Sequence, residues 1–412
     1  MIKSIVVVGA NLAGGRSVEA LRQVGFDGRI TLIGEEPWRP YERPPLSKEI
    51  LWGPGESAQK IFLHSEDWYQ ANRVDLRLGA RAVELDFFAG GVRLSDGELI
   101  PAEKFLLATG ARARLLPLSG ADAPNVHHLR TKDQADALAR DLYPGARIVV
   151  IGMGVIGSEV AASAHKIGCE VFAVEPTPAT MIRAVGERFG HWLAEKHRIK
   201  GIHVRFGVSP LVLRQREGKV HAVELSNGES IDCDAVVVGI GIVPATELAA
   251  GAGVIVDNGI VVDRSSRTSH VNVFAAGDVA SQPGFFGGRV RLETYQNAAD
   301  QAAVAAQAML GQTVEYSKPA WFWSDQYDLN IQGVGRLDDS LSIVVRGDLD
   351  SDDFSAFFLN GNVVEGVLTV NRAFEMGIGK RLVERRISVN PGALTDSSTE
   401  LRDLLKVRSD AA

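Results

Sequence analysis

The sequence contains the same βαβ pattern twice, and no other feature restricts the fold as strongly. Each copy has an apolar run, a glycine-rich turn, a helical stretch that ends at a glycine, a second apolar run and a closing glutamate. The first copy comprises residues 5–8, the motif Gly9-Ala10-Asn11-Leu12-Ala13-Gly14, Gly25, residues 30–33 and Glu35; the second comprises residues 148–151, the motif Gly152-Met153-Gly154-Val155-Ile156-Gly157, Gly168, residues 171–174 and Glu175.

This pattern is typical of a dinucleotide-binding unit. The glycines let the backbone turn tightly and approach a pyrophosphate, while the helix N-terminus supplies free N–H groups and a positive dipole. The glutamate accepts a hydrogen bond from a ribose hydroxyl. Because one unit binds one dinucleotide, the repeat predicts two dinucleotides on one polypeptide, an arrangement suited to moving electrons between them.

The composition is that of an ordinary globular chain, and it excludes several function classes. With 412 residues, 23% of them charged and 45% hydrophobic, the chain should form two or three domains. A net charge of −7 argues against nucleic-acid binding, which needs a basic face. No apolar run approaches the roughly 18 residues of a membrane span, and the apolar start of the chain enters the glycine motif as a first strand would. We therefore expect a cytoplasmic protein that binds neither nucleic acid nor membrane.

The cysteines and histidines predict no thiol or metal centre. Cys169 and Cys233 are the only cysteines and lie far apart in the sequence, which excludes a disulfide framework, a C-x-x-C pair and a four-cysteine iron–sulfur site. The nine histidines, including the pair His127 and His128, lack metal-ligand spacing. We expect no metal site.

The order of the strand signals predicts that the second nucleotide unit is inserted into the domain that the first one begins. A loop over residues 34–48, rich in turn formers and charge, is not expected to be regular. Expected strands cover residues 74–85, 92–100 with an interruption at Asp96-Gly97, 105–108, 202–206, 220–225, 235–239 and 271–276, followed by 342–346, 354–359 and 363–370, with a helix over 371–384. The expected domains are a first dinucleotide domain of residues 1–112 and 244–318, a second of 113–243, and a C-terminal α+β domain of 319–412.

Six further segments accompany the two motifs. They are Tyr41-Glu-Arg-Pro-Pro-Leu-Ser-Lys48, Leu106-Leu-Ala-Thr-Gly110, Leu129-Arg-Thr131, Phe274-Ala-Ala-Gly-Asp278, Glu293-Thr-Tyr-Gln-Asn-Ala298 and Trp321-Phe-Trp-Ser-Asp-Gln326. With them, nearly the whole chain resembles the FAD- and NADH-dependent ferredoxin reductases of bacterial oxygenase systems, the putidaredoxin reductase type of the glutathione-reductase-like flavoproteins. The resemblance implies an α/β fold with two Rossmann-like dinucleotide-binding domains, the second inserted in the first, and a C-terminal α+β domain.

The resemblance also implies cofactors and site residues. The first unit would bind FAD non-covalently, with Lys48 close to the reactive N5 edge and Asp278 accepting a hydrogen bond from the ribityl chain. The implied FAD residues are Gly9, Ala13, Gly14, Glu35, Arg43, Lys48, Ala82, Thr109, Gly110, Arg130, Asp278, Tyr295, Gln296 and Trp323. The second unit would bind NADH, with Glu159 near the carboxamide end. Its implied residues are Gly152, Gly154, Val155, Ile156, Gly157, Glu159, Glu175 and Arg183.

Glu175 favours NADH over NADPH. A carboxylate there pairs with the ribose hydroxyls and repels a 2′-phosphate, whereas NADP sites place an arginine nearby. Arg183 follows eight residues later, so the strictness of this preference stays open.

Asn11 departs from the family pattern, which usually has glycine at that position. Asparagine tolerates a left-handed backbone, but its side chain would crowd the approach of a pyrophosphate. The alternative to a functional FAD site here is a degenerate motif retained for helix–strand packing.

Simpler interpretations also exist for three other residues. Lys48 could be a surface lysine after a turn, Glu159 an acid favoured by the dipole of a helix opening at Gly157, and Asp278 only a helix N-cap.

The alternation of Trp321 and Trp323 also leaves their roles undecided. One of these tryptophans could pack in the core while the other faces the flavin.

The implied activity is that of an NADH:ferredoxin oxidoreductase. Hydride would pass from NADH to FAD N5, and single electrons would then reach a [2Fe-2S] ferredoxin that supplies a cytochrome-type or Rieske-type oxygenase. This chemistry requires no acid, base or nucleophile, and we identify none. Since residues 42–48 contain no cysteine, thiol-dependent members of the superfamily are excluded and the electrons must leave for an external acceptor. The alternatives are a rubredoxin reductase, an NADH oxidase without a redox cysteine, or a redox-sensing interaction protein.

A ferredoxin partner predicts a basic docking surface, because ferredoxins are usually acidic. The candidates are Arg289, Arg291, Arg336, Arg372, Lys380, Arg381, Arg385 and Arg386. Charges of this kind on a helix can equally be a solvated face. Nothing in the sequence indicates a subunit interface, so the oligomeric state stays open, with a monomer favoured.

Overall fold

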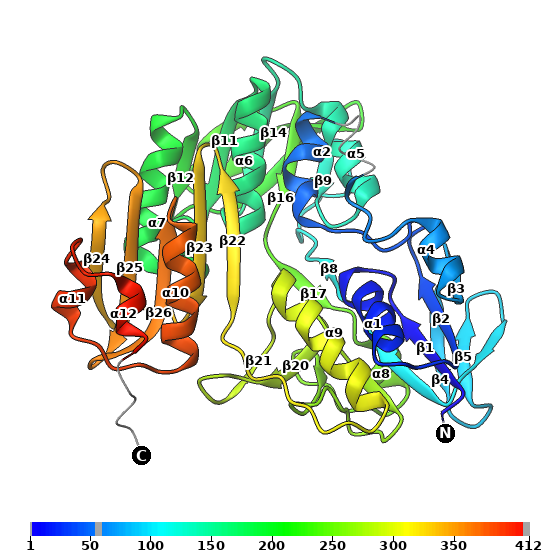
Figure 1. Cartoon of the computed structure of the whole chain (residues 1–412). Coiled ribbons are helices and arrows are strands. Elements are labelled where there is room, and N and C mark those ends of the chain that lie inside the picture. The colour runs from blue at the N-terminus through cyan, green and yellow to red at the C-terminus, as the bar shows by residue number, and fades with distance from the viewer. Residues whose placement is uncertain (1, 54–59, 407–412) are drawn as a thin grey trace. The chain divides into compact units, whose positions relative to one another are not determined.

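The computed structural model describes residues 2–53 and 60–406 of the chain (Figure 1). The chain divides into two units. The first unit comprises Met1–Arg43, Gln59–Arg112 and Ile242–Ala320; the second comprises Pro44–Ala58, Ala113–Gly241 and Trp321–Ala412. The second unit thus holds the second dinucleotide pattern together with the C-terminal segment. The finer division into three domains stays a prediction.

The first unit is built on a parallel five-stranded sheet in the order β3-β2-β1-β7-β19. Both faces of β1 are buried: Ile5 and Val7 pack into the core beneath helices α1 and α9, while Val6 and Val8 pack into the core on the opposite face. A strand covered on both faces reads as a continuous apolar run, which is why the sequence identified it. The main elements are β1 (Ser4–Val8), α1 (Leu12–Gln23), β2 (Arg29–Gly34), α4 (Glu66–Ala71), β3 (Val74–Leu78), β7 (Lys104–Leu107), β19 (Val273–Ala275) and α9 (Tyr295–Met309).

Smaller elements complete the first unit. They form the three-stranded sheets β4-β5-β6 and β18-β20-β21 and the pair β17-β8. Their bounds are β4 (Ala82–Asp86), β5 (Gly91–Leu94), β6 (Leu99–Pro101), β8 (Ala111–Ala113), which ends at the unit boundary, β17 (Ile242–Pro244), α8 (Glu247–Gly251), β18 (Ile260–Val261), β20 (Ala280–Pro283) and β21 (Arg289–Val290).

The second unit repeats the first unit's sheet. Its parallel order, β12-β11-β10-β16-β9, again puts the first strand of the βαβ pattern in the centre and the second strand beside it. Each unit also carries a three-stranded antiparallel sheet, here β13-β14-β15. The sequence repeat is therefore a structural repeat. The elements are η1 (Pro44–Ser47), α2 (Glu49–Trp52), β9 (Val126–His128), α5 (Lys132–Asp141), β10 (Arg147–Ile151), α6 (Val155–Ile167), β11 (Glu170–Glu175), α7 (Ile182–Ile199), β12 (His203–Phe206), β13 (Pro210–Arg216), β14 (Lys219–Leu225), β15 (Ser230–Asp232) and β16 (Ala235–Val238).

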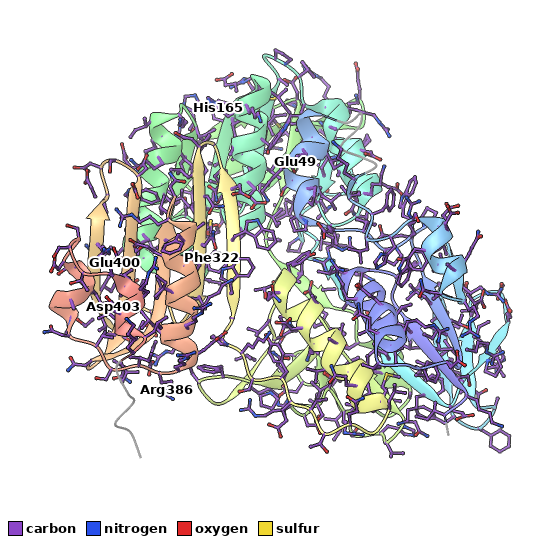
Figure 2. All side chains as sticks on the ribbon, viewed as in Figure 1. Glu49, His165, Phe322, Arg386, Glu400 and Asp403 are labelled. Atoms are coloured by element: carbon purple, nitrogen blue, oxygen red, sulfur yellow. The ribbon has the colours of Figure 1, made fainter. Side chains whose placement is uncertain are left out.

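The C-terminal segment adds an antiparallel sheet in the order β22-β23-β26-β25-β24. Helix α7 packs on it through Val185, Phe189 and Leu193, which share a core with Phe354 and with the partly buried Phe322 labelled in Figure 2. The expected strands over 342–346, 354–359 and 363–370 and the helix over 371–384 are confirmed. The elements are β22 (Trp321–Gln326), β23 (Leu329–Gly335), β24 (Ser342–Asp348), β25 (Asp353–Asn360), β26 (Val363–Val370), α10 (Ala373–Glu384), α11 (Pro391–Thr395) and α12 (Leu401–Leu404).

Some elements differ from the sequence-based expectation. The strand expected over residues 74–85 is two strands, β3 and β4, because Gly79 has a positive φ of 66° and turns the chain. The loop over 34–48, expected to be irregular, ends in the 3₁₀ helix η1. Helix α9 was not predicted, since its largely alanine sequence has weak apolar contrast between its faces. Within the described ranges, no helix is both long and apolar enough to cross a membrane.

A buried histidine makes the stability of the second unit depend on pH. His197 in α7 is fully buried; its Nδ1 lies 2.7 Å from Tyr327 Oη, and its Nε2 has no hydrogen-bond partner among the described residues. Burial lowers the pKa of His197 to about 4, below the ordinary value near 6.5. The unfolded chain therefore binds a proton that the folded chain excludes.

We expect this histidine to contribute stability above about pH 6.5 that is lost as the pH falls toward 4, a change of about 3 kcal/mol. Urea unfolding at several pH values measures it. In His197→Gln, the free energy of unfolding should fall less over this interval. An equal pH dependence in both proteins would show that His197 is not responsible.

Candidate dinucleotide sites

The two glycine turns have the same construction. Gly9 and Gly152 both have positive φ, +114° and +94°. The amide of Gly9 donates to the carbonyl of Ile33 at 2.7 Å, and that of Gly152 to the carbonyl of Val174 at 2.8 Å. Each turn is thereby fastened to the second strand of its βαβ unit, which brings the following helix N-terminus to the carboxyl end of the sheet.

The third glycine of each motif is required for packing. A Cβ on Gly14 would lie 1.9 Å from the carbonyl oxygen of Gly9, and one on Gly157 would lie 1.9 Å from that of Gly152. Gly154 differs, because no heavy atom in the described part of the chain lies within 4 Å of its Cβ position. Its missing side chain serves no packing and keeps the backbone open to approach, as a bound pyrophosphate requires.

Asn11 occupies the corresponding position in the first motif. Its φ is −108°, so the tolerance of asparagine for a left-handed backbone is not used. Its Oδ1 accepts from Gly14 N at 3.3 Å, capping α1, and its Nδ2 donates to the Ala108 carbonyl at 2.5 Å. Both polar atoms thus bind the turn itself. Helix α6, by contrast, has Gly154 as N-cap and no side-chain cap, so its first N–H groups fit a phosphate ligand.

The two closing glutamates have different environments. Glu175 is buried, and its two carboxylate oxygens accept from Met153 N at 2.7 Å and Thr177 N at 2.8 Å. It therefore fixes the turn that precedes α6 as well as ending β11. Glu35 is exposed and lies 3.8 Å from Arg81. Arg183 is exposed on α7.

Glu175→Gln is expected to lower the preference for NADH over NADPH by about tenfold if Glu175 binds the ribose as predicted, because the substitution removes a negative charge that would repel a 2′-phosphate. The measurement is the ratio of kcat/KM for the two coenzymes. Adding Arg183→Ala should reduce the acquired use of NADPH if that arginine binds the phosphate. An unchanged ratio in Glu175→Gln would show that coenzyme choice is set elsewhere.

Arg43 belongs to a charged cluster of the first unit. The cluster includes Glu36, which was not among the residues predicted from the sequence. Its Nη2 donates to Glu36 Oε1 at 2.8 Å, and Tyr41 Oη donates to Glu36 Oε2 at 2.5 Å. Burial would lower the pKa of Arg43, but Tyr41 and Glu36 outweigh burial and raise it. The neighbouring acid Glu42 accepts from the hydroxyl of Tyr295 at 2.6 Å.

Lys48 and Glu159 form a buried ion pair in the second unit. Their side chains are 7% and 3% exposed, and Lys48 Nζ lies 2.9 Å from Glu159 Oε2. The interpretation of Lys48 as a surface lysine is therefore wrong. Helix α6 begins at Val155, not at Gly157, so Glu159 lies beyond the first turn and the helix dipole is not its main partner.

The other predicted residues are distributed between the two units. Asp278 follows β19 and precedes β20, so the N-cap interpretation is wrong. Thr109 Oγ1 donates to the Ala245 carbonyl at 2.7 Å. The remaining positions are Ala13 in α1, Ala82 at the start of β4, Gly110 after β7 with a φ of +67°, Arg130 before α5, Gln296 in the first turn of α9, and Val155 and Ile156 at the start of α6.

Trp321 and Trp323 stack on each other with ring centroids 5.3 Å apart. The hypothesis that they take opposite positions, one in the core and one outside, is wrong, because residues two apart on a strand share a face. Lys380 Nζ lies 3.4 Å from the centre of the Trp321 ring.

The two cysteines lie in the interior of the second unit. Both are buried, and burial raises the pKa of Cys233 to about 12 and also raises that of Cys169. Such thiols are poor nucleophiles. Between residues 2 and 53 and between 60 and 406, no group of histidines, cysteines and carboxylates could hold a metal ion.

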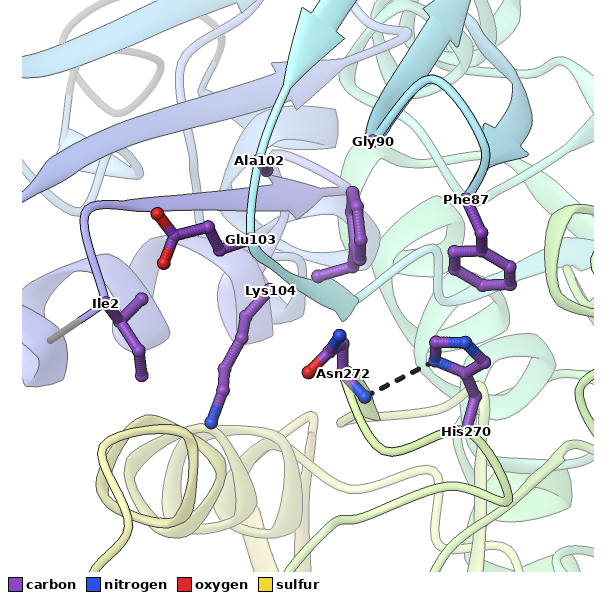
Figure 3. Close-up of a pocket in the computed structure, with 9 residues that line it drawn as sticks. Ile2, Phe87, Gly90, Ala102, Glu103, Lys104, His270 and Asn272 are labelled. Carbon is purple, nitrogen blue, oxygen red and sulfur yellow. Dashed lines mark hydrogen bonds between the residues drawn. The ribbon is translucent and has the colours of Figure 1, made fainter.

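A surface pocket of the first unit lies away from the glycine motifs (Figure 3). It is lined at the start of β7 by Glu103 and Lys104, with His270 and Asn272 beside them. Lys104 Nζ donates to the Met309 carbonyl at 2.5 Å. Ligands of open α/β sheets bind at the carboxyl ends of the strands, so this pocket is not a dinucleotide site.

The chain is similar in sequence to known families and to individual known proteins. Residues 3–302 match the family model described as pyridine nucleotide-disulphide oxidoreductase, and residues 321–405 match a reductase C-terminal model. The chain belongs to the pyridine nucleotide-disulphide oxidoreductase family. This oxidoreductase is 40% identical over 403 residues to the ferredoxin–NAD(+) reductase component of the p-cumate 2,3-dioxygenase system of Pseudomonas putida, covering 98% of both chains. It is 39% identical over 400 residues to rhodocoxin reductase of Rhodococcus erythropolis, covering 97% of this chain and 93% of that one.

Solved structures agree with this assignment. The covalent putidaredoxin reductase–putidaredoxin complex matches with a TM-score of 0.94 and 35% identity over 98% of both chains. The ferredoxin reductase for the CYP199A2 system from Rhodopseudomonas palustris matches with a TM-score of 0.93 and 36% identity over 97% of this chain and 99% of that one. The predicted fold class, the family, an NADH-dependent oxidoreductase activity and the cofactors FAD and NADH are confirmed.

Proposed function

We propose that this oxidoreductase transfers electrons from NADH, through bound FAD, to a [2Fe-2S] ferredoxin that supplies an oxygenase, and that it does so in the cytoplasm. The observation that carries the proposal is the presence of two dinucleotide turns in a chain whose two cysteines are both buried. A chain without an accessible thiol must deliver its electrons to an external acceptor. Bound FAD supplies the conversion between two-electron and one-electron chemistry.

The residues of the chain bind and orient. The turn of Gly9, Ala13 and Gly14 would hold the FAD pyrophosphate, and the uncapped N-terminus of α6 would hold that of NADH. Lys48, fixed by Glu159, would place its ammonium at the flavin edge. We also propose that the other residues implied by the resemblance bind FAD and NADH. The chain would then divide into an FAD-binding, an NADH-binding and a C-terminal domain.

The docking surface is proposed on α10. Most of the candidate cations already have partners: Arg291 pairs with Glu293 at 2.7 Å, Arg336 and Arg386 pair with Glu365 at 2.8 and 3.3 Å, Arg372 pairs with Glu375 at 3.2 Å, and Arg289 donates to backbone carbonyls. Arg381 and Arg385 are exposed on or beside α10 and form no ion pair with any residue that the structure describes. They can therefore meet an acidic partner without breaking an existing contact.

We expect the ferredoxin KM to rise with ionic strength, because exposed charges steer association. Arg381→Glu combined with Arg385→Glu should raise this KM by about tenfold and reduce its salt dependence. The assay couples NADH oxidation through a panel of ferredoxins to cytochrome c reduction, with NADH:ferricyanide turnover reporting on the flavin step alone. If the ferredoxin KM changed with neither salt nor substitution, Arg381 and Arg385 would be part of a solvated face and not of a docking surface. Turnover with oxygen alone, and none with any ferredoxin, would contradict the proposed function.

A further inference from the structure

Strand β22 buries two polar side chains, those of Ser324 and Gln326. Alternate residues of a strand point to opposite faces, and on this strand Asp325 is exposed while Ser324 and Gln326 are 0% and 1% exposed. The buried face also carries Phe322, which packs against the α7 core (Figure 2). Buried polar groups are costly unless they are hydrogen-bonded, so the positions of Ser324 and Gln326 point to specific partners.

Those partners lead to Glu159. The Ser324 hydroxyl lies 2.8 Å from Glu159 Oε1, and Gln326 Nε2 lies 3.0 Å from Ser324 Oγ. A glutamine nitrogen can only donate, and a hydroxyl has a single proton. Gln326 therefore donates to Ser324, and Ser324 donates to the carboxylate. Gln326 Nε2 also lies 3.2 Å from Met181 Sδ, which helps to fix the orientation of the amide.

The other oxygen of the carboxylate is held from a different segment. Glu159 Oε2 accepts from Ser47 Oγ at 2.5 Å and lies 2.9 Å from Lys48 Nζ. The C-terminal segment thus holds one oxygen and the segment around Ser47 holds the other. If Ser324 lost its hydroxyl, Oε1 would lose its donor and the carboxylate could rotate about its terminal bond.

We propose that Ser324 is a positioning residue for the nicotinamide end of NADH, acting through Glu159, with Gln326 directing its proton. This inference rests on the proposed function, in which Glu159 faces the carboxamide. The C-terminal segment then contributes to coenzyme binding as well as to docking of the protein partner.

The test compares Ser324→Ala with Ser163→Ala in the FAD-loaded full chain. Ser163 is a matched control, because its buried hydroxyl donates to the Ser47 carbonyl at 2.6 Å and not to Glu159. Calorimetry gives the NAD⁺ Kd, stopped flow gives the limiting rate of flavin reduction by NADH, and thermal unfolding gives stability. We expect Ser324→Ala to raise the Kd by about tenfold, the effect of losing a hydrogen bond to a charged group, while Ser163→Ala leaves the Kd within about twofold.

A double-mutant cycle tests whether Ser324 affects NAD⁺ binding through Glu159. In a Glu159→Gln background, which keeps an acceptor oxygen in place, Ser324→Ala should change the NAD⁺ Kd little further, because residues in one network are not additive. Equal Kd values for Ser324→Ala and Ser163→Ala, or full additivity with Glu159→Gln, would overturn this inference alone. Failure of the wild-type holoprotein to bind NAD⁺ or to be reduced by NADH would overturn the proposed function with it.

Discussion

Gly157→Ala is expected to destabilise the second unit by about 3 kcal/mol or more, because the added Cβ cannot be accommodated. It would lie 1.9 Å from the carbonyl oxygen of Gly152, an atom of a backbone turn that is itself hydrogen-bonded to β11. Denaturant unfolding followed by circular dichroism measures the loss.

Gly154→Ala is the matched control for this change. We expect it to weaken NADH binding and to leave stability unchanged. Its Cβ meets no heavy atom of the described residues within 4 Å, and its φ of −71° suits alanine. Stability should stay within about 0.5 kcal/mol of wild type, while the KM for NADH rises by about tenfold or more because the methyl group obstructs the pyrophosphate. Equal stability losses in the two variants, or an unchanged KM in Gly154→Ala, would contradict this division of roles.

Glu159→Ala is expected to cost about 3–5 kcal/mol of unfolding free energy, since it leaves the Lys48 ammonium buried without its counter-ion. Lys48→Ala should also destabilise, because it leaves the Glu159 carboxylate buried without its counter-ion, and it should slow the reduction of flavin by NADH. Urea unfolding and stopped-flow absorbance of the flavin measure the two effects.

A double variant separates stability from function at this ion pair. In Lys48→Met combined with Glu159→Leu, both charges give way to apolar groups of similar size, a change that is often neutral or stabilising in a buried site. We expect most of the stability to return while flavin reduction remains slow. If reduction recovered together with stability, the pair would be only a packing element.

The parts of the fold that were predicted are those specified locally. The glycine turns, the strands beside them and the closing glutamates lie within about thirty residues of sequence in each copy, the length of one βαβ unit. Their spacing alone predicted both dinucleotide-binding βαβ units, while the fold with two Rossmann-like domains was implied by the family resemblance. Helix α7 was missed, because Gly186 has a φ of +79° that interrupts it, and the alanine-rich α9 was missed because its faces differ little.

The parts of the site that were not predicted depend on residues far apart in the chain. The bond from Ser47 to Glu159 spans 112 positions, and the bond from Ser324 to Glu159 spans 165. No sequence period reports such a contact. One signal was available, because Ser324 and Gln326 are two residues apart on a strand and therefore share one of its faces. That signal indicates a buried polar face only once it is known which face of the strand points into the protein.

The polar face of β22 has a consequence for engineering this enzyme. Exchanging the segment Trp321–Ala412 with that of a relative is an obvious route to a chimera with a new electron acceptor. Such a graft also replaces Ser324 and Gln326, and so it alters the support of Glu159. If the proposed roles of α10 and Ser324 hold, we expect a chimera that keeps these two residues to change the recipient of the electrons without altering how NADH is held.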